Sequence, residues 1–461
     1  MTAMPDAFDV VVIGAGTGGY SSALRAAQLD KKVALVERDD RLGGTCLLRG
    51  CIPTKALLQS AAVMDAVTRS KEWGIKASGE PEWPAVQDFQ AKVVDKLVSG
   101  LTSLVKARKI EIVKGTAKLT SPSAVEVDGR NLEAGAVVVA TGSQPKLLPG
   151  MDVGKRIITS DQALTLDRLP SSAVVIGAGA VGLEFASLYR SFGAEVTLIE
   201  ALDRLAPLED EDISKEVARA FRKRGIVAHA GAKVQEAKEG RDAVTVTFEA
   251  GGKSESVKAD ICLVAVGRGP VTEGLGLEDI GVEVDRGYVK VDGQCRTTVD
   301  GVWALGDVCT SPFQLAHVSM AEGVQVAERI AGTEVPDLDY AGVPRVTFST
   351  PEISSVGLTE AQAKERGAEV EIEKFSMQGL GKANMLREGG LCKVVGEKDG
   401  PVLGVHMIGP HVTDLIAEAM LITNWEAMPS EVAALIHPHP TLSEAIGEAH
   451  LALAGRPLHA M

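Results

Sequence analysis

The chain has 461 residues, a length that predicts about three domains at roughly 150 residues each. Its 62 acidic and 48 basic residues leave a formal net charge of −14. This charge argues against binding to a nucleic-acid backbone and against a basic membrane anchor. Hydrophobic residues make up 45% of the chain, as in an ordinary folded protein, but its 49 glycines are more than usual. The glycines therefore need a specific explanation.

The first residues contain no basic leader, and no apolar stretch reaches the length of about 18 residues that a membrane span requires. The most hydrophobic segment, 173–189, is interrupted by glycines and by Glu184. We therefore expect a cytoplasmic protein without a membrane segment. Six cysteines are too few for a secreted disulfide scaffold. Four of them are isolated and are expected to be small, buried or half-buried side chains, namely Cys262, Cys295, Cys309 and Cys392.

Strands alternate with helical segments through the first half, which predicts an α/β protein with parallel sheets. The first β–α–β unit is expected to consist of strand 8–13, a glycine-rich turn with a helix to about residue 28, and strand 32–37. A second unit repeats this order with strands 172–176 and 195–200. Further strands that end in glycine turns are expected at 137–142, 263–267 and 302–307. Beyond residue 344 we expect a separate α+β domain, with strands at 392–395 and 403–408.

Each β–α–β unit contains a glycine-rich dinucleotide-binding fingerprint. In both copies an acid lies 23 positions after the first glycine. Glycines in this pattern permit a tight turn and let backbone amides approach a pyrophosphate at a helix N-terminus, and the acid can bind a ribose. Two nucleotides are therefore expected to bind. The fingerprint residues are Gly14, Gly16, Gly19 and Glu37 in the first copy, and Gly177, Gly179, Gly182 and Glu200 in the second.

The second acid also indicates which nicotinamide nucleotide binds. A carboxylate at Glu200 pairs with the free 2′-hydroxyl of NAD and repels the 2′-phosphate of NADP. The nearby Arg204 is the one contrary feature, and we interpret it as a solvated residue. NAD is therefore the expected nucleotide.

Cys46 and Cys51 form a candidate redox pair nine positions after Glu37. In an undistorted helix their axial separation would be about 7.5 Å, beyond the limit of about 7 Å for a disulfide. A bridge therefore needs a distorted turn, for which Gly50 and a nearby proline are suitable. A thiolate near a helix N-terminus and near Lys55 would have a lowered pKa, which suits thiol–disulfide exchange. A half metal site and two inert thiols are the alternatives, and we expect no metal.

A candidate base lies near the C-terminus, in the proline-rich segment 437–444. Prolines fix the backbone and give His439 a rigid mount. Glu444 can hold one imidazole nitrogen and raise the basicity of the ring, so that the other nitrogen takes a proton from a thiol. His317 is expected to lie near a cofactor.

Together these motifs resemble the dihydrolipoyl dehydrogenase family of flavin-dependent pyridine nucleotide–disulfide oxidoreductases, from residue 8 to the C-terminus. The resemblance implies two Rossmann-like dinucleotide-binding domains, for FAD and NAD, and a C-terminal α+β dimerisation domain. The implied boundaries are 1–150 for the first part of the FAD domain, 151–270 for the NAD domain, 271–343 for a return to the FAD domain, and 344–461 for the dimerisation domain.

The same resemblance implies roles for individual residues. Cys46 would exchange with the substrate, Cys51 would contact the flavin, and His439 would be the base that Glu444 orients. Lys55 and Glu184 would form an ion pair beside the isoalloxazine ring. Since the histidine of one subunit would serve the cysteines of the other, a homodimer is implied. The remaining implied cofactor contacts are Thr45, Ala117, Gly142, Val234, Gly267, Asp307, Ala316 and His317.

The implied reaction is the oxidation of protein-bound dihydrolipoyl groups with reduction of NAD⁺. The implied partner is the lipoyl-bearing acyltransferase subunit of a 2-oxo acid dehydrogenase complex, or the lipoyl protein of glycine cleavage. The chain departs from the family pattern at Arg49, between the cysteines, and at Val318, where a lysine is usual. Arg49 would place a cation beside the redox pair. The alternatives are another NAD(P)H-dependent disulfide reductase and a non-catalytic subunit of a complex.

Overall fold

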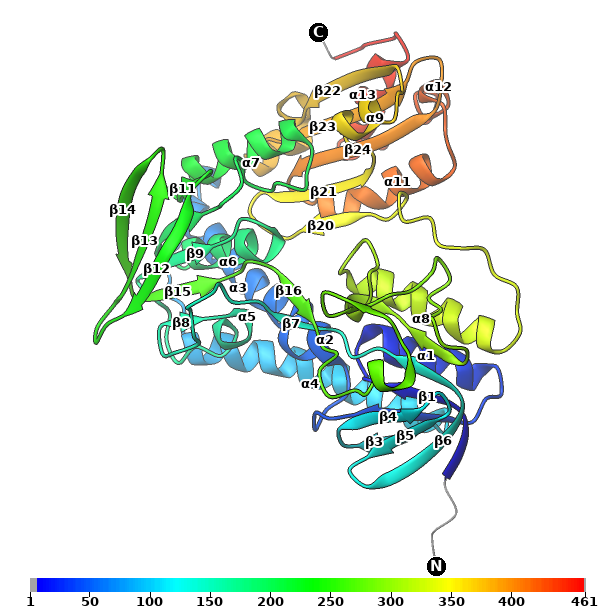
Figure 1. Cartoon of the computed structure of the whole chain (residues 1–461). Helices are drawn as coiled ribbons and strands as arrows, with labels where there is room; N and C mark the ends of the chain where they lie inside the picture. Colours follow the sequence, from blue (N-terminus) through cyan, green and yellow to red (C-terminus); the bar gives the residue numbers. More distant parts are fainter. Residues whose placement is uncertain (1–5, 460–461) are drawn as a thin grey trace, which may run out of the picture. The chain divides into compact units, whose positions relative to one another are not determined.

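The computed structural model describes residues 6–459, which form two compact units (Figure 1). Each unit is built from three separate stretches of chain, so the chain leaves the first unit and returns to it twice. The described residues of unit 1 are 6–56, 84–146 and 268–338, and those of unit 2 are 57–83, 147–267 and 339–459.

The main sheet of unit 1 carries the first nucleotide fingerprint. Its strands are hydrogen-bonded in the order β3-β2-β1-β6-β5-β4, and β19 also pairs with β6. The strands nearest the fingerprint are parallel, and their apolar side chains are buried because both faces of the sheet are covered. The seven strands are β1 (Asp6–Ile13), β2 (Val33–Glu37), β3 (Glu111–Lys114), β4 (Ala117–Ser121), β5 (Ala124–Val127), β6 (Arg130–Val139) and β19 (Val302–Ala304).

Two helices of unit 1, α1 (Thr17–Gln28) and α8 (Ala316–Ile330), lie side by side (Figure 1). Their backbones approach closely because each helix has a glycine at the contact, Gly18 on α1 and Gly323 on α8. A Cβ at Gly323 would lie 2.4 Å from the carbonyl oxygen of Gly18. The hydroxyls of Thr17 and Ser319 are 2.7 Å apart. This packing fixes the N-terminus of α1 directly after the glycine loop that follows β1.

Unit 2 contains the second β–α–β unit in a parallel sheet of order β11-β10-β9-β15-β8. Helix α6 (Ala180–Ser191) connects the predicted strands β9 and β10. A three-stranded antiparallel sheet, β12-β13-β14, belongs to the same unit. The strands are β8 (Ile157–Ile158), β9 (Ser172–Ile176), β10 (Glu195–Ile199), β11 (Val227–His229), β12 (Lys233–Glu239), β13 (Val244–Ala250), β14 (Lys253–Ala259) and β15 (Ile261–Val264).

The last segment of unit 2 forms an antiparallel sheet of order β20-β21-β24-β23-β22, which confirms the α+β texture predicted beyond residue 344. Helices α11 (Val412–Asn424) and α13 (Glu444–Leu453) pack against it through a buried apolar core. Together with the two parallel sheets, this arrangement confirms the predicted fold class. The five strands are β20 (Arg345–Thr347), β21 (Glu352–Gly357), β22 (Val370–Ser376), β23 (Leu391–Glu397) and β24 (Val402–Gly409).

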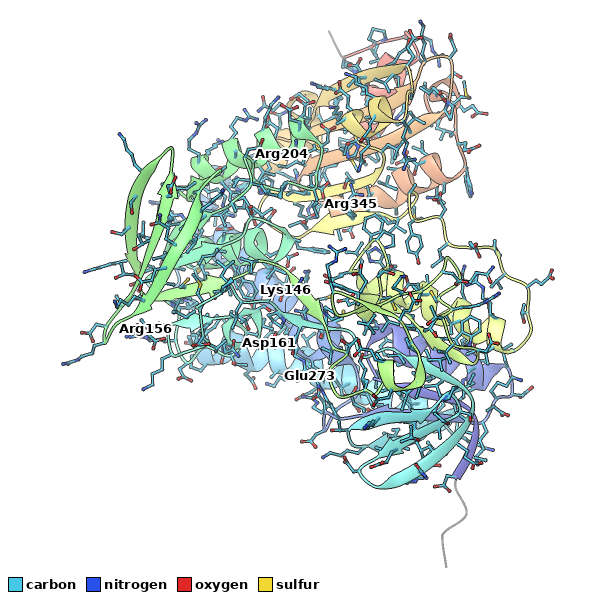
Figure 2. The ribbon with its side chains drawn as sticks, in the orientation of Figure 1. Lys146, Arg156, Asp161, Arg204, Glu273 and Arg345 are labelled. Carbon is cyan, nitrogen blue, oxygen red and sulfur yellow. The ribbon has the colours of Figure 1, made fainter. Side chains whose placement is uncertain are left out.

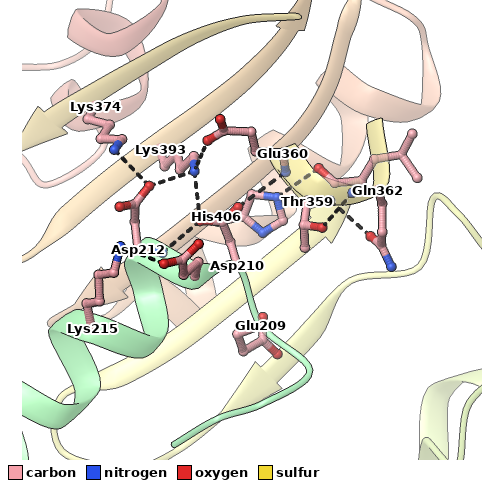
Figure 3. Close-up of polar contacts among 12 residues, drawn as sticks. Glu209, Asp210, Asp212, Lys215, Thr359, Glu360, Gln362, Lys374, Lys393 and His406 are labelled. Carbon is pink, nitrogen blue, oxygen red and sulfur yellow. Dashed lines mark hydrogen bonds and ion pairs between the residues drawn. The ribbon is translucent and has the colours of Figure 1, made fainter. Parts of the chain in front are cut away.

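A buried lysine connects this antiparallel sheet to α7 (Glu211–Lys223) within unit 2 (Figure 3). The side chain of Lys393 is 1% exposed, and its Nζ lies 2.8 Å from Asp210, 2.7 Å from Asp212 and 2.7 Å from Glu360. Burial acts to lower the pKa of Lys393, but the hydrogen bonds to the three carboxylates raise it overall. Because Asp210 also caps α7 by accepting from the amide of Asp212, the cluster fixes the loop that leads from β10 to α7.

The four isolated cysteines are buried, as predicted. Burial raises the pKa of Cys262 and of Cys392 to about 12, so both thiols stay protonated near neutral pH. Between residues 6 and 459, the structure contains no helix that is both long and apolar enough to cross a membrane.

Candidate active site

The three glycines of the first fingerprint have different surroundings. A Cβ at Gly14 would lie 2.4 Å from the carbonyl oxygen of Ala140, and one at Gly19 would lie 1.8 Å from that of Gly14. A Cβ at Gly16 would meet nothing closer than an atom of Gly44 at 3.9 Å. The outer glycines therefore allow tight backbone packing, and the middle one leaves room for a pyrophosphate to approach the chain.

The second fingerprint repeats this pattern. A Cβ at Gly177 would lie 2.4 Å from the carbonyl oxygen of Ala265, and one at Gly182 would lie 1.9 Å from that of Gly177. A Cβ at Gly179 would meet no atom within 4 Å. Since the same contacts recur in both copies, both loops fit a dinucleotide pyrophosphate.

Glu37, the acid of the first fingerprint, is buried and held by backbone amides. Its Oε2 accepts from the amide of Ala15 at 2.8 Å, inside the glycine loop, and its Oε1 accepts from the amide of Asp39 at 2.9 Å. Each oxygen keeps a lone pair that can accept from a ribose hydroxyl. The residues present therefore fit the adenosine end of FAD.

Glu200 is held in the same way in the second copy. It accepts from the amide of Ala178 at 2.6 Å and from that of Leu202 at 2.8 Å. Arg204, labelled in Figure 2, lies on the loop between β10 and α7, and its Nη2 donates to the carbonyls of Pro207 at 3.0 Å and Glu209 at 3.4 Å. Arg204 is the one residue whose presence argues against NAD, and its Nη2 is hydrogen-bonded within its own loop.

The two motif cysteines lie on either side of a helix break. Cys46 is on α2 (Gly44–Arg49), and Cys51 begins α3 (Cys51–Arg69). Gly50 separates the helices with φ −145° and ψ −110°, and a Cβ there would lie 2.9 Å from the carbonyl oxygen of Thr45. The distorted turn that a bridge between these cysteines needs is therefore present.

The predicted lowering of the thiol pKa is wrong for Cys46. The pKa of Cys46 is well above its usual range, and the largest cause of this rise is the hydrogen bond with Cys51. Burial raises the pKa further, whereas the positive charge of Lys55 lowers it. Two thiols in one half-buried site do not ionise together, because each thiolate disfavours the ionisation of the other. Burial and, to a smaller extent, both cysteines also raise the pKa of Tyr20, a residue that no sequence motif connects with the pair.

A hydrogen-bonded network in unit 1 joins two predicted cofactor residues, Asp307 and Thr45. Ser143 donates to Asp307 at 2.6 Å, and Arg268 donates to Ser143 Oγ at 2.7 Å and to Thr45 Oγ1 at 3.4 Å. Burial raises the pKa of Asp307, and Ser143 and Arg268 oppose it. No sequence motif indicates the two connecting residues, Ser143 and Arg268, although each directly follows a predicted glycine, Gly142 or Gly267.

Arg49 forms an ion pair with Asp39, two residues after Glu37. Lys55 is the cation that acts on the pKa of Cys46, and Arg49 is not among the causes. The positive charge between the cysteines is therefore paired with a carboxylate of the segment that follows Glu37.

Lys55 lies on α3 in unit 1, and Glu184 lies on α6 in unit 2. Glu184 Oε1 accepts from the amide of Phe348 at 2.9 Å, and its ion pair with Lys55 stays a prediction. Over residues 6–459, no group of three or more His, Cys, Asp and Glu side chains is arranged to hold a metal ion. The other predicted contacts lie on β4 for Ala117, β12 for Val234, and the first turn of α8 for Ala316 and His317.

The structure brings His439 and Glu444 together in unit 2. His439 Nδ1 is 2.8 Å from Glu444 Oε1, and the amide of Thr441 donates to Oε2 at 2.8 Å. The imidazole is 76% exposed. Burial acts to raise the pKa of Glu444, but hydrogen bonds from His439 and Thr441 outweigh it and lower the pKa. The ionised carboxylate fixes Nδ1, which leaves Nε2 to take a proton.

Residues 8–323 match the model of the pyridine nucleotide-disulphide oxidoreductases, and residues 343–450 match the dimerisation domain of that group, which supports a homodimer. The chain is 42% identical to a dihydrolipoyl dehydrogenase of Bacillus subtilis, with 99% of this chain and all of that protein covered. It is 40% identical to leghemoglobin reductase of Glycine max, with 98% and 88% covered.

Two solved structures are similar over almost the whole chain. LpdA of Mycobacterium tuberculosis superposes with a TM-score of 0.89 at 26% identity, covering 97% of this chain and 99% of that one. The HOCl-induced flavoprotein disulfide reductase RclA of Escherichia coli gives a TM-score of 0.86 at 27% identity, covering 96% and 99%.

Proposed function

Since the chain belongs to the pyridine nucleotide-disulphide oxidoreductase family, whose members bind FAD and NAD(P), we propose that it oxidises protein-bound dihydrolipoyl groups and reduces NAD⁺. The observation that carries the proposal is the contact between Cys46 and Cys51 across the break at Gly50. The helix that bears Cys46 begins against the first nucleotide loop, because a Cβ at Gly44 would lie 2.5 Å from Gly16 Cα. This contact supports the proposal that the thiol chemistry takes place next to the FAD site.

In the proposed reaction, His439 of the partner subunit takes the proton from one thiol of the substrate. The resulting thiolate attacks Cys46 of the oxidised pair, and the Cys46–Cys51 bond breaks to leave a Cys51 thiolate and a mixed disulfide. The second substrate thiol then attacks the substrate sulfur of that disulfide, so that the lipoyl disulfide leaves and Cys46 is released as a thiol. Bound FAD supplies the chemistry that carries the two electrons from the reduced pair to NAD⁺.

NAD is the proposed nucleotide of the second site. Its support is the buried carboxylate of Glu200, which would repel a 2′-phosphate. The engagement of Arg204 within its own loop adds to this support.

The proposed assembly is a cytoplasmic homodimer that serves a lipoyl-bearing acyltransferase subunit of a 2-oxo acid dehydrogenase complex, or the lipoyl protein of glycine cleavage. Its support is the full-length similarity to dihydrolipoyl dehydrogenases. We further propose domain limits of 1–150 and 271–343 for FAD binding, 151–270 for NAD binding, and 344–461 for dimerisation.

The experiment that tests the substrate is a panel of turnover assays with the purified flavin-containing protein. Dihydrolipoamide with NAD⁺ should give fast NADH formation, and NADP⁺ or reduced glutathione should give little. Flavin binding and NADH oxidation without dihydrolipoamide turnover would instead indicate another disulfide substrate, as for a flavoprotein disulfide reductase of the RclA kind. A protein without flavin and without turnover would be a non-catalytic subunit.

The role of His439 can be tested separately. His439→Ala should slow dihydrolipoamide oxidation by about 10²-fold or more. NADH oxidation by an artificial electron acceptor should change little, since it needs no substrate thiolate. Equal losses in both assays would refute the assignment of His439 as the base.

A further inference from the structure

A second histidine–carboxylate pair lies beside the candidate base. His437, two residues before His439, has its Nε2 2.7 Å from Glu418 Oε1 on α11. We propose that His437 is a positioning residue, which clamps the base-bearing turn between α11 and α13 and thereby keeps His439 in contact with Glu444. The inference rests on the proposed function, in which His439 takes the proton of the substrate.

The imidazole of His437 is held between two helices. Its side chain is 12% exposed, against 76% for His439. On one side Glu418 of α11 binds Nε2, and on the other the ring packs on the backbone of α13, where a Cβ at Gly447 would lie only 2.5 Å from Nδ1. Glycine is therefore the residue that allows the ring to lie this close to α13.

Hydrogen bonds within the turn connect the position of His437 to that of Glu444. Pro438, which separates the two histidines, accepts a hydrogen bond from Thr441 Oγ1 at 2.7 Å. The amide of the same threonine donates to Glu444 Oε2 at 2.8 Å. A displacement of His437 would therefore move Pro438, and through Thr441 it would disturb the carboxylate that orients His439.

The charge of His437 also favours the contact between Glu444 and His439. The hydrogen bond to Glu418 raises the pKa of His437 more than burial lowers it, and a backbone hydrogen bond to Leu435 adds to the rise. The other titratable groups that face it are Glu444 and His450 on α13. A positive His437 helps to lower the pKa of Glu444, so Glu444 stays ionised, which is the state that holds His439.

The chain offers a matched control on the same helix. Glu448 of α13 pairs with His459 at 2.8 Å, which is the same chemistry at an exposed histidine near the end of the chain. Glu448→Gln removes a histidine–carboxylate contact without touching the base-bearing turn, and its activity should stay at the wild-type level.

The test compares Glu418→Gln and Gly447→Ala with this control in the FAD-loaded protein. Both variants should lower kcat/KM for dihydrolipoamide about tenfold, less than the loss of the base itself, and leave NADH oxidation by an artificial acceptor unchanged. The loss should appear in kcat and not in KM for dihydrolipoamide, because the contact between His439 and Glu444 is disturbed while the binding of the substrate is not. Since both changes act through His437, the double variant should be no slower than the slower single variant.

Several results would overturn the positioning role. They are variants indistinguishable from Glu448→Gln, equal losses in both assays, or additive effects in the double variant. A wild type that does not turn over dihydrolipoamide would refute the proposed function instead, and NMR detection of the hydrogen bond at His439 Nδ1 in labelled protein would then still test the positioning role. An unchanged hydrogen bond between His439 Nδ1 and Glu444 in Glu418→Gln would refute the clamp whatever the substrate is.

Discussion

The middle glycine of the second fingerprint offers a sharp test of the nucleotide site. Gly179 has φ −76°, a value that alanine adopts, and a Cβ there would meet no protein atom within 4 Å. Gly179→Ala should therefore leave the free energy of unfolding nearly unchanged. The added methyl group would occupy the space in which we expect the pyrophosphate to approach the backbone.

The size of the effect follows from the hydrogen bonds that would be lost. One hydrogen bond to a charged group contributes about 1.5–3 kcal/mol, so the loss of one should raise KM for NAD⁺ about 10- to 150-fold. The matched control is Gly182→Ala, whose Cβ would lie 1.9 Å from the carbonyl oxygen of Gly177. That clash is with backbone, so this variant should lose about 1–3 kcal/mol of stability or more.

The assay combines thermal unfolding of both variants with the dependence of turnover on NAD⁺ concentration. Gly179→Ala should unfold like the wild type and show a high KM for NAD⁺, and Gly182→Ala should unfold at a lower temperature. If Gly179→Ala bound NAD⁺ as tightly as the wild type, the open space at this glycine would not be where the nucleotide approaches.

Three further predictions concern charged groups. Lys393→Met should lower the free energy of unfolding by about 3–5 kcal/mol, because three carboxylates lose their buried partner, and denaturant unfolding would show this; a loss below about 1 kcal/mol would contradict it. Arg49→Gln and Asp39→Asn should speed FAD release about equally, as measured by flavin fluorescence, with the potential of the redox pair unchanged; a shifted potential in Arg49→Gln alone would show that the cation acts on the cysteines. Because folding raises the pKa of His437, the stability lost in Glu418→Gln should be largest below about pH 6.5 and should vanish as the pH rises through the folded-state pKa. A loss that grows with pH in denaturant titrations would contradict this sign.

The fold was predictable where local patterns determine it. The apolar segments 8–13 and 172–176 lie within a residue or two of β1 and β9, because a buried parallel strand followed by a glycine loop is recognisable without distant contacts. The helix break between Cys46 and Cys51 followed from the reach of a disulfide and from the glycine between them.

What escaped prediction depends on contacts between distant residues. The thiol of Cys51, across the helix break, has the largest effect on the pKa of Cys46. The short sequence distance to Lys55 predicted a lowered pKa, but the pKa is raised. Arg49 was expected to act beside the redox pair, but its partner is Asp39. Glu418 lies on α11, 19 positions before His437. No local sequence motif therefore predicts that these two residues form a pair.

The central claim is that the Cys46–Cys51 pair transfers electrons from a dihydrolipoyl group to NAD⁺. The most direct measurement is the rate of NADH formation from dihydrolipoamide and NAD⁺ by the flavin-containing wild type, beside Cys46→Ser under the same conditions. We predict rapid NADH formation by the wild type and none by Cys46→Ser, with flavin retained in both. A wild type that holds flavin and oxidises NADH, yet forms no NADH from dihydrolipoamide, would contradict the claim.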